Sequence, residues 1–587
     1  MRNYGGNTIF SASDLVNFMG CAHATVLDTT NLVTPMVAAS DDEYAALLQQ
    51  KGIEHERAYL RRLQEEGRSV VEIASTGPLE ERADATRRAM QEGHDVIYQG
   101  AFLVGRWHGY SDFLIRRNDA TSSLGSYAYD VADTKLARSA KAKHVLQLCV
   151  YADMLTDVQG VAPPAMHVVL GSGEITSLRT SSVLHYFTVA RRRFEAFVNL
   201  PPTTSAGDPC GHCTFCRWTE KCGAEWDAAD HLSIIAGMGR GQISALRAEG
   251  IDEIGQLAAT PIETRVPGMQ PATLTRLVNQ ARLQGHQRQT GDRLVELLPP
   301  SSGRGFERLP LPDHGDIFFD MEGDPLFDGG LEYLFGIVAF NDASEDCFHE
   351  FWAHDRASEK IAFEQTIDFM IDRLARHPNA HIYHYAAYEQ TALKKLAMYH
   401  GTRETQVDDL LRCDRMVDLY RVVVESIRTS EPRYSIKNME AFYLPGGRQG
   451  EVKNGGDSII IYERWRQIGG EQLLREIAEY NEIDCRSTRL CRDWLLSLRP
   501  PETLWFEGRQ IAPADPVKTA AREDADERTR RLAEALTDRR DEPWRQLLAN
   551  LLEFHRREAK PSWWAMFARQ DMDYSATIWV RGQRLSG

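Results

Sequence analysis

A positive net charge, long apolar runs and a P-loop are all missing from this 587-residue sequence. The formal net charge is −16. It argues against a generally basic nucleic-acid coat protein but not against a nuclease, since phosphate-binding grooves are local features. No stretch of 18 apolar residues and no basic-then-apolar leader occurs, so we expect no membrane span and a cytoplasmic protein. The absence of G-x-x-x-x-G-K-[ST] means that the sequence carries no ATP-binding loop.

The composition indicates several folded domains. Apolar residues make up 43% and charged residues 26% of the chain, as in ordinary soluble globular proteins. A chain of this length is too long for one hydrophobic core, so two to four domains are expected. The ten cysteines should stay reduced in the cytoplasm, and a cysteine cluster would therefore indicate a metal site rather than disulfides.

The segment 316–324, DIFFDMEGD, joins an apolar run to a group of acids. Alternation along a strand would point Asp320 and Glu322 to the same face. Two neighbouring carboxylates repel each other and are costly to bury unless a cation lies between them. The segment therefore predicts a strand that delivers two metal ligands, whereas Asp324, before Pro325, is expected to be a turn residue.

Two later segments extend this pattern. HIYHYAAYE at 381–389 indicates a strand running into a helix that begins near Glu389, and YNEID at 480–484 places Tyr480 and Asp484 one helical turn apart. This order of motifs resembles the DEDD (DnaQ-like) exonucleases, which have a ribonuclease H-like fold, in their tyrosine subtype. SIKNMEAFYLP and YNEIDCRSTRLCRDWL are similar to the YprB-type branch of that fold.

The resemblance implies a role for each of these residues. Two Mg²⁺ or Mn²⁺ ions about 3.5–4 Å apart can activate a water and stabilise the leaving oxygen of a phosphodiester. Asp320, Glu322 and Asp484 would supply the oxygen ligands that such ions require. Glu389, where that family usually has Asp, would reach the second ion, and Tyr480 would orient the attacking water.

The first 228 residues carry a second ordered series. It consists of His55 in a helix, Asp112 on a strand, Asp133 and Lys135 at the end of another strand, and Gln147 and Tyr151 four residues apart on the next helix. The series resembles the PD-(D/E)xK fold of RecB-like nucleases, including the Q-x-x-x-Y signature, with Asp at position 133 where Glu is commoner.

By that likeness a divalent metal would be held by His55, Asp112 and Asp133, with help from the Thr134 carbonyl. Lys135 would position the water and offset charge on the scissile phosphate. The glutamine and tyrosine of the Q-x-x-x-Y signature, Gln147 and Tyr151, would orient the site and contact DNA.

The same segment closes with the spacing Cys213-x2-Cys216-x5-Cys222, and Cys21 stands far upstream. This pattern resembles the iron–sulfur staple of RecB-like nucleases and implies a 4Fe–4S cluster on those four thiolates. The alternative is zinc bound by Cys210 together with Cys213, Cys216 and Cys222, a compact set with acceptable ligand spacing. Cys21 has no role in the zinc alternative.

The rest of the chain predicts a helical middle and a helical tail. Residues 229–298 show helices separated by GMGRGQ and VPGMQP and resemble helix-hairpin-helix modules, which accept backbone phosphates. A structural spacer is the alternative. The charged tail ends in PSWWAMF, in which an exposed Trp563-Trp564 pair is expected to suit a docking contact.

These expectations define a multidomain α/β chain. It comprises a RecB-like PD-(D/E)xK nuclease domain at 1–228, a helix-hairpin-helix-like domain at 229–298, a ribonuclease H-like exonuclease domain at 306–500 and a helical tail at 501–587, a candidate docking segment. The order resembles the N-terminal half of a bacterial RecB-like nuclease family, many members of which continue into a superfamily I helicase. A separate helicase is therefore a candidate partner.

The predicted function is metal-dependent processing of DNA in repair, recombination or defence against foreign DNA. One alternative is a ribonuclease in which only the C-terminal site is active. Another is a nucleic-acid binding platform with decayed sites that recruits a helicase. No motif reads bases, so sequence specificity is not expected.

Overall fold

The structure is a computed structural model that describes residues 1–39, 43–448, 452, 454–508, 516–538, 542–552, 554–570, 579–580 and 583–584. Contacts between Cα atoms divide the chain into two units, each assembled from separate stretches of sequence. One comprises Met1–Leu298, Glu322–Tyr333 and Ile427–Asn481, and the other Pro299–Met321, Leu334–Ser426 and Glu482–Gly587. Among the described helices, none combines the length and the apolar character needed to cross a bilayer.

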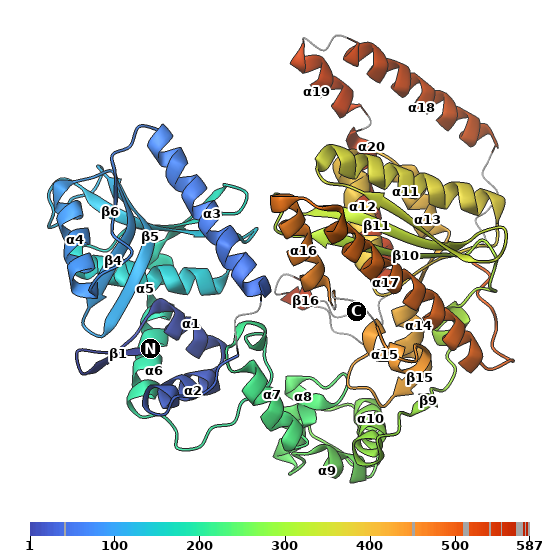
Figure 1. Ribbon diagram of the computed structural model, residues 1–587, viewed down its shortest axis with the longest axis horizontal. Helices are drawn as coiled ribbons and strands as arrows, with labels where there is room; N and C mark the ends of the chain where they lie inside the picture. Colours follow the sequence, from blue (N-terminus) through green and yellow to red (C-terminus); the bar gives the residue numbers. More distant parts are fainter. Residues whose placement is uncertain are drawn as a thin grey trace. The chain divides into compact units, whose positions relative to one another are not determined.

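A six-stranded mixed sheet organises the N-terminal region (Figure 1). Its strand order is β3 (Val70–Glu72), β4 (Val96–Val104), β5 (Trp107–Arg117), β6 (Ala128–Lys135), β7 (Ala165–Leu170) and β8 (Ile175–Arg179). Strands β4, β5 and β6 are antiparallel neighbours, whereas β6 and β7 pair in parallel. The parallel pair needs a crossover, which helix α5 (Ala142–Gln159) supplies.

Helices surround this sheet. Before it come the hairpin β1 (Arg2–Tyr4) and β2 (Asn7–Ile9) and helices α1 (Ala12–Gly20), α2 (Ala22–Val33) and α3 (Glu43–Glu65); α4 (Leu79–Glu92), α6 (Leu184–Asn199) and α7 (Thr219–Ala228) follow along the chain. The backbone N–H of Ser11 donates to the Asp14 carboxylate over 2.7 Å, a capping box that begins α1. Phe10, Trp107 and Phe194 form an edge-to-face aromatic cluster in the main core.

The middle region is helical and has its own core. Helices α8 (Arg240–Ala248), α9 (Ile254–Ala259) and α10 (Pro271–Thr290) enclose a cluster that includes Leu246, Leu257 and Leu277. Strand β9 (Val295–Leu297) then pairs with β15 (Ile427–Thr429), which follows about 130 residues later. The Gln280 side chain donates to the Thr429 carbonyl over 2.8 Å and so fastens α10 to β15.

The second large sheet has five strands in the order β12, β11, β10, β13, β14. The strands are β10 (Ile317–Asp324), β11 (Leu331–Phe340), β12 (Asp346–Trp352), β13 (Ile382–His384) and β14 (Met416–Asp418). Strands β10, β13 and β14 run parallel, and β11 is antiparallel to β12. Helices α11 (Arg356–Arg376), α12 (Tyr388–His400) and α13 (Glu404–Arg412) pack on one face (Figure 1), where they bury Ile317, Phe319 and Met321.

The alternate residues of β10 belong to the opposite face. There the guanidinium of Arg492, from the long helix α17 (Glu471–Leu498), lies 4.9 Å from the Phe318 ring and 5.2 Å from the Tyr383 ring. Asp320 and Glu322 follow Phe318 in steps of two and therefore share its face of the strand. The side of the sheet that carries the acids is the side that α17 covers.

The remaining elements are short strands and helices. They are α14 (Leu419–Ser426), α15 (Ile436–Tyr443), α16 (Gly455–Ile468), α18 (Pro516–Thr537), α19 (Pro543–Leu551), α20 (Phe554–Gln570), β16 (Trp579–Val580) and β17 (Gln583–Arg584). The expectation of an exposed tryptophan pair in the tail is wrong for one member. Trp563 is 53% exposed, but Trp564 is 8% exposed and its indole N–H donates to Asp408 over 3.0 Å.

A buried ion pair joins the start of β10 to α17. Arg492 Nη1 lies 2.7 Å from Asp316 Oδ2, and both side chains are almost fully buried. The second Asp316 oxygen accepts the backbone N–H of His381 over 3.0 Å. The pair therefore connects β10, the beginning of β13 and α17 at one point.

Removing the arginine should destabilise this sheet. The change Arg492→Ala leaves Asp316 buried without its cation, which typically costs about 3–5 kcal/mol. We expect the urea transition that reports the C-terminal sheet to shift by that amount. Arg475→Ala, which removes an exposed partner of Glu471 on the same helix, is the control and should change the free energy of unfolding by less than about 0.5 kcal/mol. Equal effects of the two substitutions would contradict the assignment.

Candidate nuclease sites

Three carboxylates converge where β10 meets α17. Ligand oxygens of Asp320, Glu322 and Asp484 lie within 4.8 Å of one another. Two come from one face of the strand and the third from the helix that covers that face. Glu322 is 7% and Asp484 9% exposed. Like charges this close and this buried repel strongly, so the donor set fits hard divalent cations such as Mg²⁺ or Mn²⁺.

Glu389 lies in the same electrostatic environment. Burial raises the pKa of the Cys485 thiol well above its usual value, and the negative charges of Asp320, Asp484 and Glu389 add to the effect. All three carboxylates therefore act on one buried atom. Glu389 stands in the first turn of α12, as the sequence predicts, and is 4% exposed.

A histidine holds Glu389 in place. His384 Nδ1 lies 3.3 Å from Glu389 Oε2, and both side chains are buried. Burial alone would lower the pKa of His384, but the adjacent Glu389 carboxylate outweighs burial and raises it. The other ring nitrogen, Nε2, lies 3.0 Å from the Gln390 amide. The imidazole is thus fixed at both nitrogens, and it restrains the longer glutamate arm at this position.

Basic groups flank Tyr480. The ammonium of Lys437 lies 5.2 Å and the guanidinium of Arg448 5.6 Å from the centre of its ring. Arg448 also donates to both oxygens of Glu440. Sequence reasoning quoted the segment around Lys437 without assigning it a role. A cation beside the tyrosine of a nuclease motif is suited to a phosphate, and Lys437 is the exposed one of the two.

Asp324 is not the simple turn residue that the sequence predicts. It ends β10 and is 1% exposed, and its Oδ1 accepts the Leu326 N–H over 2.8 Å. Burial and the neighbouring Glu463 carboxyl raise the pKa of Asp324 to about 7. Asp324 therefore belongs to a buried carboxyl pair and stands outside the three-carboxylate cluster.

The N-terminal sheet assembles a second polar centre at the ends of β5 and β6. Asp112 Oδ2 accepts the backbone N–H of Thr134 over 2.8 Å and its hydroxyl over 2.9 Å. Asp133 is fully buried and forms an ion pair with Lys135. Burial raises the pKa of Asp133 well above its usual value, and the Asp112 charge raises it further. The site therefore favours a cation beside these two acids.

The Q-x-x-x-Y pair lies beside Asp133. Gln147 on α5 donates to Asp133 Oδ1 over 3.4 Å and to the Tyr151 hydroxyl over 3.1 Å. Gly109 leaves the space for the tyrosine, because a Cβ there would lie only 2.7 Å from Tyr151 Cε1. Four of the residues that the sequence predicts for this site thus contact one another or share a partner.

The helix α3 contributes a residue that sequence reasoning missed. Burial raises the pKa of Glu56, and the negative charge of Asp112 adds to the shift while Lys135 opposes it. Glu56 therefore faces the acids. Its neighbour His55, predicted as a metal ligand, has Nε2 3.3 Å from the Val169 carbonyl. In the described part of the chain, the ligand atoms of His55, Asp112 and Asp133 do not form a group within 4.8 Å.

Five thiols gather near the end of this region. Cys210 and Cys213 have their Sγ atoms 3.8 Å apart. Burial raises the pKa of Cys21, and the Cys210 and Cys216 charges add to that effect. Burial also raises the pKa of Cys222 to about 11, where the Glu225 charge adds before any thiolate. The distant Cys21 thus lies near the C-x2-C-x5-C segment.

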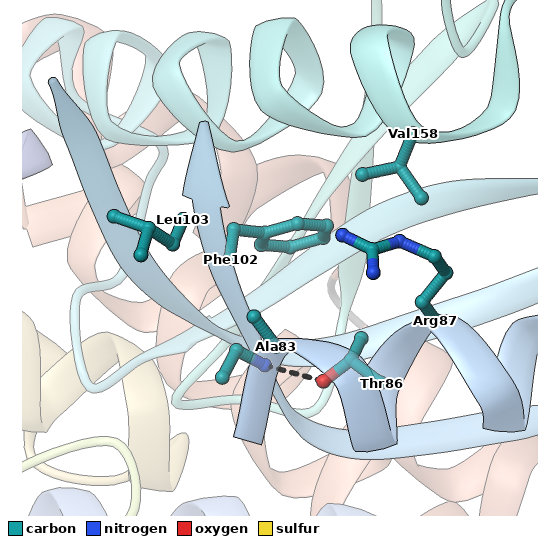
Figure 2. A pocket seen from close by; sticks show the side chains of 7 residues that line it. Ala83, Thr86, Arg87, Phe102, Leu103 and Val158 are labelled. Atoms are coloured by element: carbon teal, nitrogen blue, oxygen red, sulfur yellow. Dashed lines mark hydrogen bonds between the residues drawn. The ribbon is translucent and has the colours of Figure 1, made fainter. Parts of the chain in front are cut away.

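A small pocket elsewhere in the N-terminal region belongs to neither centre. Figure 2 shows its lining, which includes Thr86 and Arg87 of α4, Phe102 of β4 and Val158 of α5. The Thr86 hydroxyl accepts the Ala101 N–H over 2.9 Å. No carboxylate lines this pocket, so it offers no cation site.

Comparison with known proteins bears on the C-terminal region. Residues 317–496 match the family model of the RNase H superfamily, which covers less than a third of the chain. Among curated proteins, none matches the chain. The match supports a ribonuclease H-like domain around the five-stranded sheet, and it indicates a nuclease-type phosphodiesterase that binds nucleic acid. Nucleases of this superfamily use divalent metals such as Mg²⁺, consistent with the carboxylate cluster.

The cluster should bind a divalent cation that depends on each acid. Asp320→Asn keeps the shape of the side chain but removes a charge, so we expect Mn²⁺ affinity at this site to fall by at least about tenfold, as loss of even an outer-shell partner does. Isothermal titration calorimetry of the full chain measures the change. Asp342→Asn, an exposed acid between β11 and β12, is the matched control, and an equal loss there would contradict the assignment.

Proposed function

We propose that the protein is a DNA-processing enzyme with two metal-dependent nuclease sites. The observation that carries the proposal is the convergence of Asp320, Glu322 and Asp484 within 4.8 Å in a region that matches the RNase H superfamily. Repulsion among three carboxylates is a standing cost that divalent cations relieve. A phosphodiester is the substrate whose charge such cations also stabilise.

In the C-terminal site the chain's own residues divide the work. Divalent ions, when bound, supply Lewis acidity and a nucleophile at neutral pH. Asp320, Glu322 and Asp484 would hold those ions, and Glu389, fixed by its histidine, would orient the second. The Tyr480 hydroxyl would align the attacking water, and Lys437 would bind the phosphate that precedes the cut. The expected reaction is 3′–5′ exonucleolytic hydrolysis.

In the N-terminal site the arrangement supports a RecB-like mechanism. Asp112 and Asp133 would hold a divalent ion, with His55 and the Thr134 carbonyl as further ligands. Lys135 would place the water and offset charge on the phosphate in the transition state. Glu56 adds a carboxylate next to this ion. Gln147, tied to Asp133 and Tyr151, would keep the acid in position against DNA.

The other regions fit this function as accessories. The helices of 229–298 would bind backbone phosphates, as helix-hairpin-helix modules do, without reading bases. The chain lacks a P-loop, so unwinding would need a separate helicase as partner. Repair, recombination and defence against foreign DNA would all use such an enzyme.

The cysteines would hold an iron–sulfur cluster that ties the ends of the N-terminal domain together. Cys21, Cys213 and Cys216 would provide three thiolates, and Cys210 or Cys222 the fourth. A zinc ion on the local cysteines remains the alternative. Both forms use thiolates that are far apart in sequence or spacing but adjacent in the fold.

Single-site variants separate the two nuclease activities. End-labelled single-stranded DNA, duplex DNA and RNA are incubated with Mn²⁺ and wild type, Asp133→Ala or Asp484→Ala. We expect each substitution to remove a different set of products and to lower the corresponding rate by at least about 10²-fold, the usual cost of losing a group that stabilises transition-state charge. Asp342→Ala, which changes an exposed acid, should leave both sets unchanged.

The outcomes distinguish the alternatives. Loss of all cleavage in Asp484→Ala, with RNA as the better substrate and no effect of Asp133→Ala, would establish a ribonuclease with one active site. Binding of DNA without cleavage by wild type would establish a platform with decayed sites. Either result overturns the two-nuclease proposal.

The cofactor makes an independent prediction. Protein purified without oxygen should contain iron and acid-labile sulfide, and Cys213→Ser should lose both because one of four thiolate ligands is gone. Cys347→Ser, a partly exposed thiol on β12, should retain them. Zinc without iron in wild type would favour the alternative.

A further inference from the structure

A second metal-binding arrangement lies beside the cysteines. Ligand atoms of His23, Cys222 and Glu225 fall within 4.8 Å of one another. His23 comes from α2, and the other two come from α7, where they are three residues apart and so share a face. The imidazole and the thiol are each 8% exposed. The carboxylate stands at the solvent edge, where Lys221 contacts it at 2.7 Å.

The histidine ring is held so that one nitrogen faces this group. Ser205 Oγ lies 2.8 Å from Nδ1. The other nitrogen, Nε2, is buried and has no hydrogen-bond partner among the described residues. A buried polar atom left in this state costs free energy, and ligation of a metal would remove that cost. Metal-binding histidines typically have their second nitrogen fixed by a hydrogen bond, which is the role of Ser205.

The backbone around the ring is shaped to admit it. A Cβ on Gly207 would lie 2.7 Å from His23 Cδ2, so only glycine leaves room for the imidazole there. The carbonyl of Gly207 in turn accepts the indole N–H of Trp226 over 2.6 Å. Trp226 follows Glu225 in α7. The loop that orients the histidine is thus tied to the helix that carries the other two groups.

From this geometry we propose that His23 Nε2, Cys222 Sγ and a Glu225 oxygen bind one divalent transition-metal ion of the zinc class, with water in the fourth position. Imidazole, thiolate and carboxylate are the three ligand types of protein zinc sites. On binding, the Cys222 thiol releases its proton and forms the S–metal bond, with no change of oxidation state. Burial lowers the pKa of His23, so the imidazole is neutral at pH 7, as a ligand must be.

The assignment also settles which thiol serves the neighbouring cofactor. Five cysteines gather, one more than a four-thiolate group needs. Cys222 interacts with Glu225 before any thiolate, whereas Cys213 interacts first with Cys210 and then with Cys21. The zinc-class ion takes Cys222, and Cys21, Cys210, Cys213 and Cys216 remain for the cluster. The ion links α2 to α7 and acts as a structural tie, and the exposed Lys221–Glu225 pair, worth little in water, gives way to it.

Metal analysis of the full chain tests the proposal. The chain is purified without oxygen, stripped of loosely bound metal and titrated with Zn²⁺ against a chromophoric chelator, while iron is measured separately. We expect one high-affinity zinc per chain. His23→Gln and Glu225→Gln should each weaken zinc binding at least about tenfold without lowering iron content. Glu220→Gln, an exposed acid on the same helix, should leave zinc binding unchanged.

Cobalt substitution identifies the sulfur ligand. Co²⁺ in the wild-type chain should give a thiolate-to-cobalt charge-transfer band that Cys222→Ser abolishes and Cys210→Ser preserves. Unchanged zinc affinity in both His23→Gln and Glu225→Gln would overturn the proposal, as would loss of iron but not zinc in Cys222→Ser. Circular dichroism confirms that each variant is folded. Because the readout is metal content, the result is independent of whether either nuclease site is active.

Discussion

The pairing of Arg492 with Asp316 is the contact on which the geometry of the C-terminal site depends. The guanidinium lies between the rings of Phe318 and Tyr383 while it neutralises the carboxylate at the entry to β10. One buried side chain thereby fixes the distance and the register of helix α17 against two parallel strands. Asp484 stands two turns before this arginine on the helix. A slip at the ion pair would therefore separate Asp484 from the acids of the strand.

The two candidate sites solve the problem of buried negative charge differently. In the N-terminal site, Lys135 comes from the same strand as Asp133 and offsets part of the charge within the protein. In the C-terminal site, three carboxylates face one another, and His384 acts on the fourth acid, Glu389, from the side. The first site is partly neutralised in advance, whereas the second depends more heavily on the cations it binds.

Strand alternation and helical spacing were sufficient to predict the acids of β10 and α17, because a period of two or of about four residues determines which side chains share a face. The same reasoning could not choose between His55 and Glu56 on α3. Both lie in one helical pattern, and only the packing of that helix on the sheet decides which of them faces Asp112. Trp564 was misjudged for the same reason, since its burial depends on Asp408 about 150 residues away. His23 carried no signal at all, because its partners are about 200 residues downstream.

The pairing of β9 with β15 has a consequence for the order of events during synthesis. Strand β9 ends at Leu297, yet its partner begins at Ile427, and the Gln280 side chain waits for the same strand. At ribosomal rates of about 5–20 residues per second, the delay is on the order of ten seconds. The helical middle region must therefore persist on the ribosome with one edge incomplete while the five-stranded sheet is still being made. A chaperone that shields that edge during translation would raise the yield of folded protein without touching either nuclease centre.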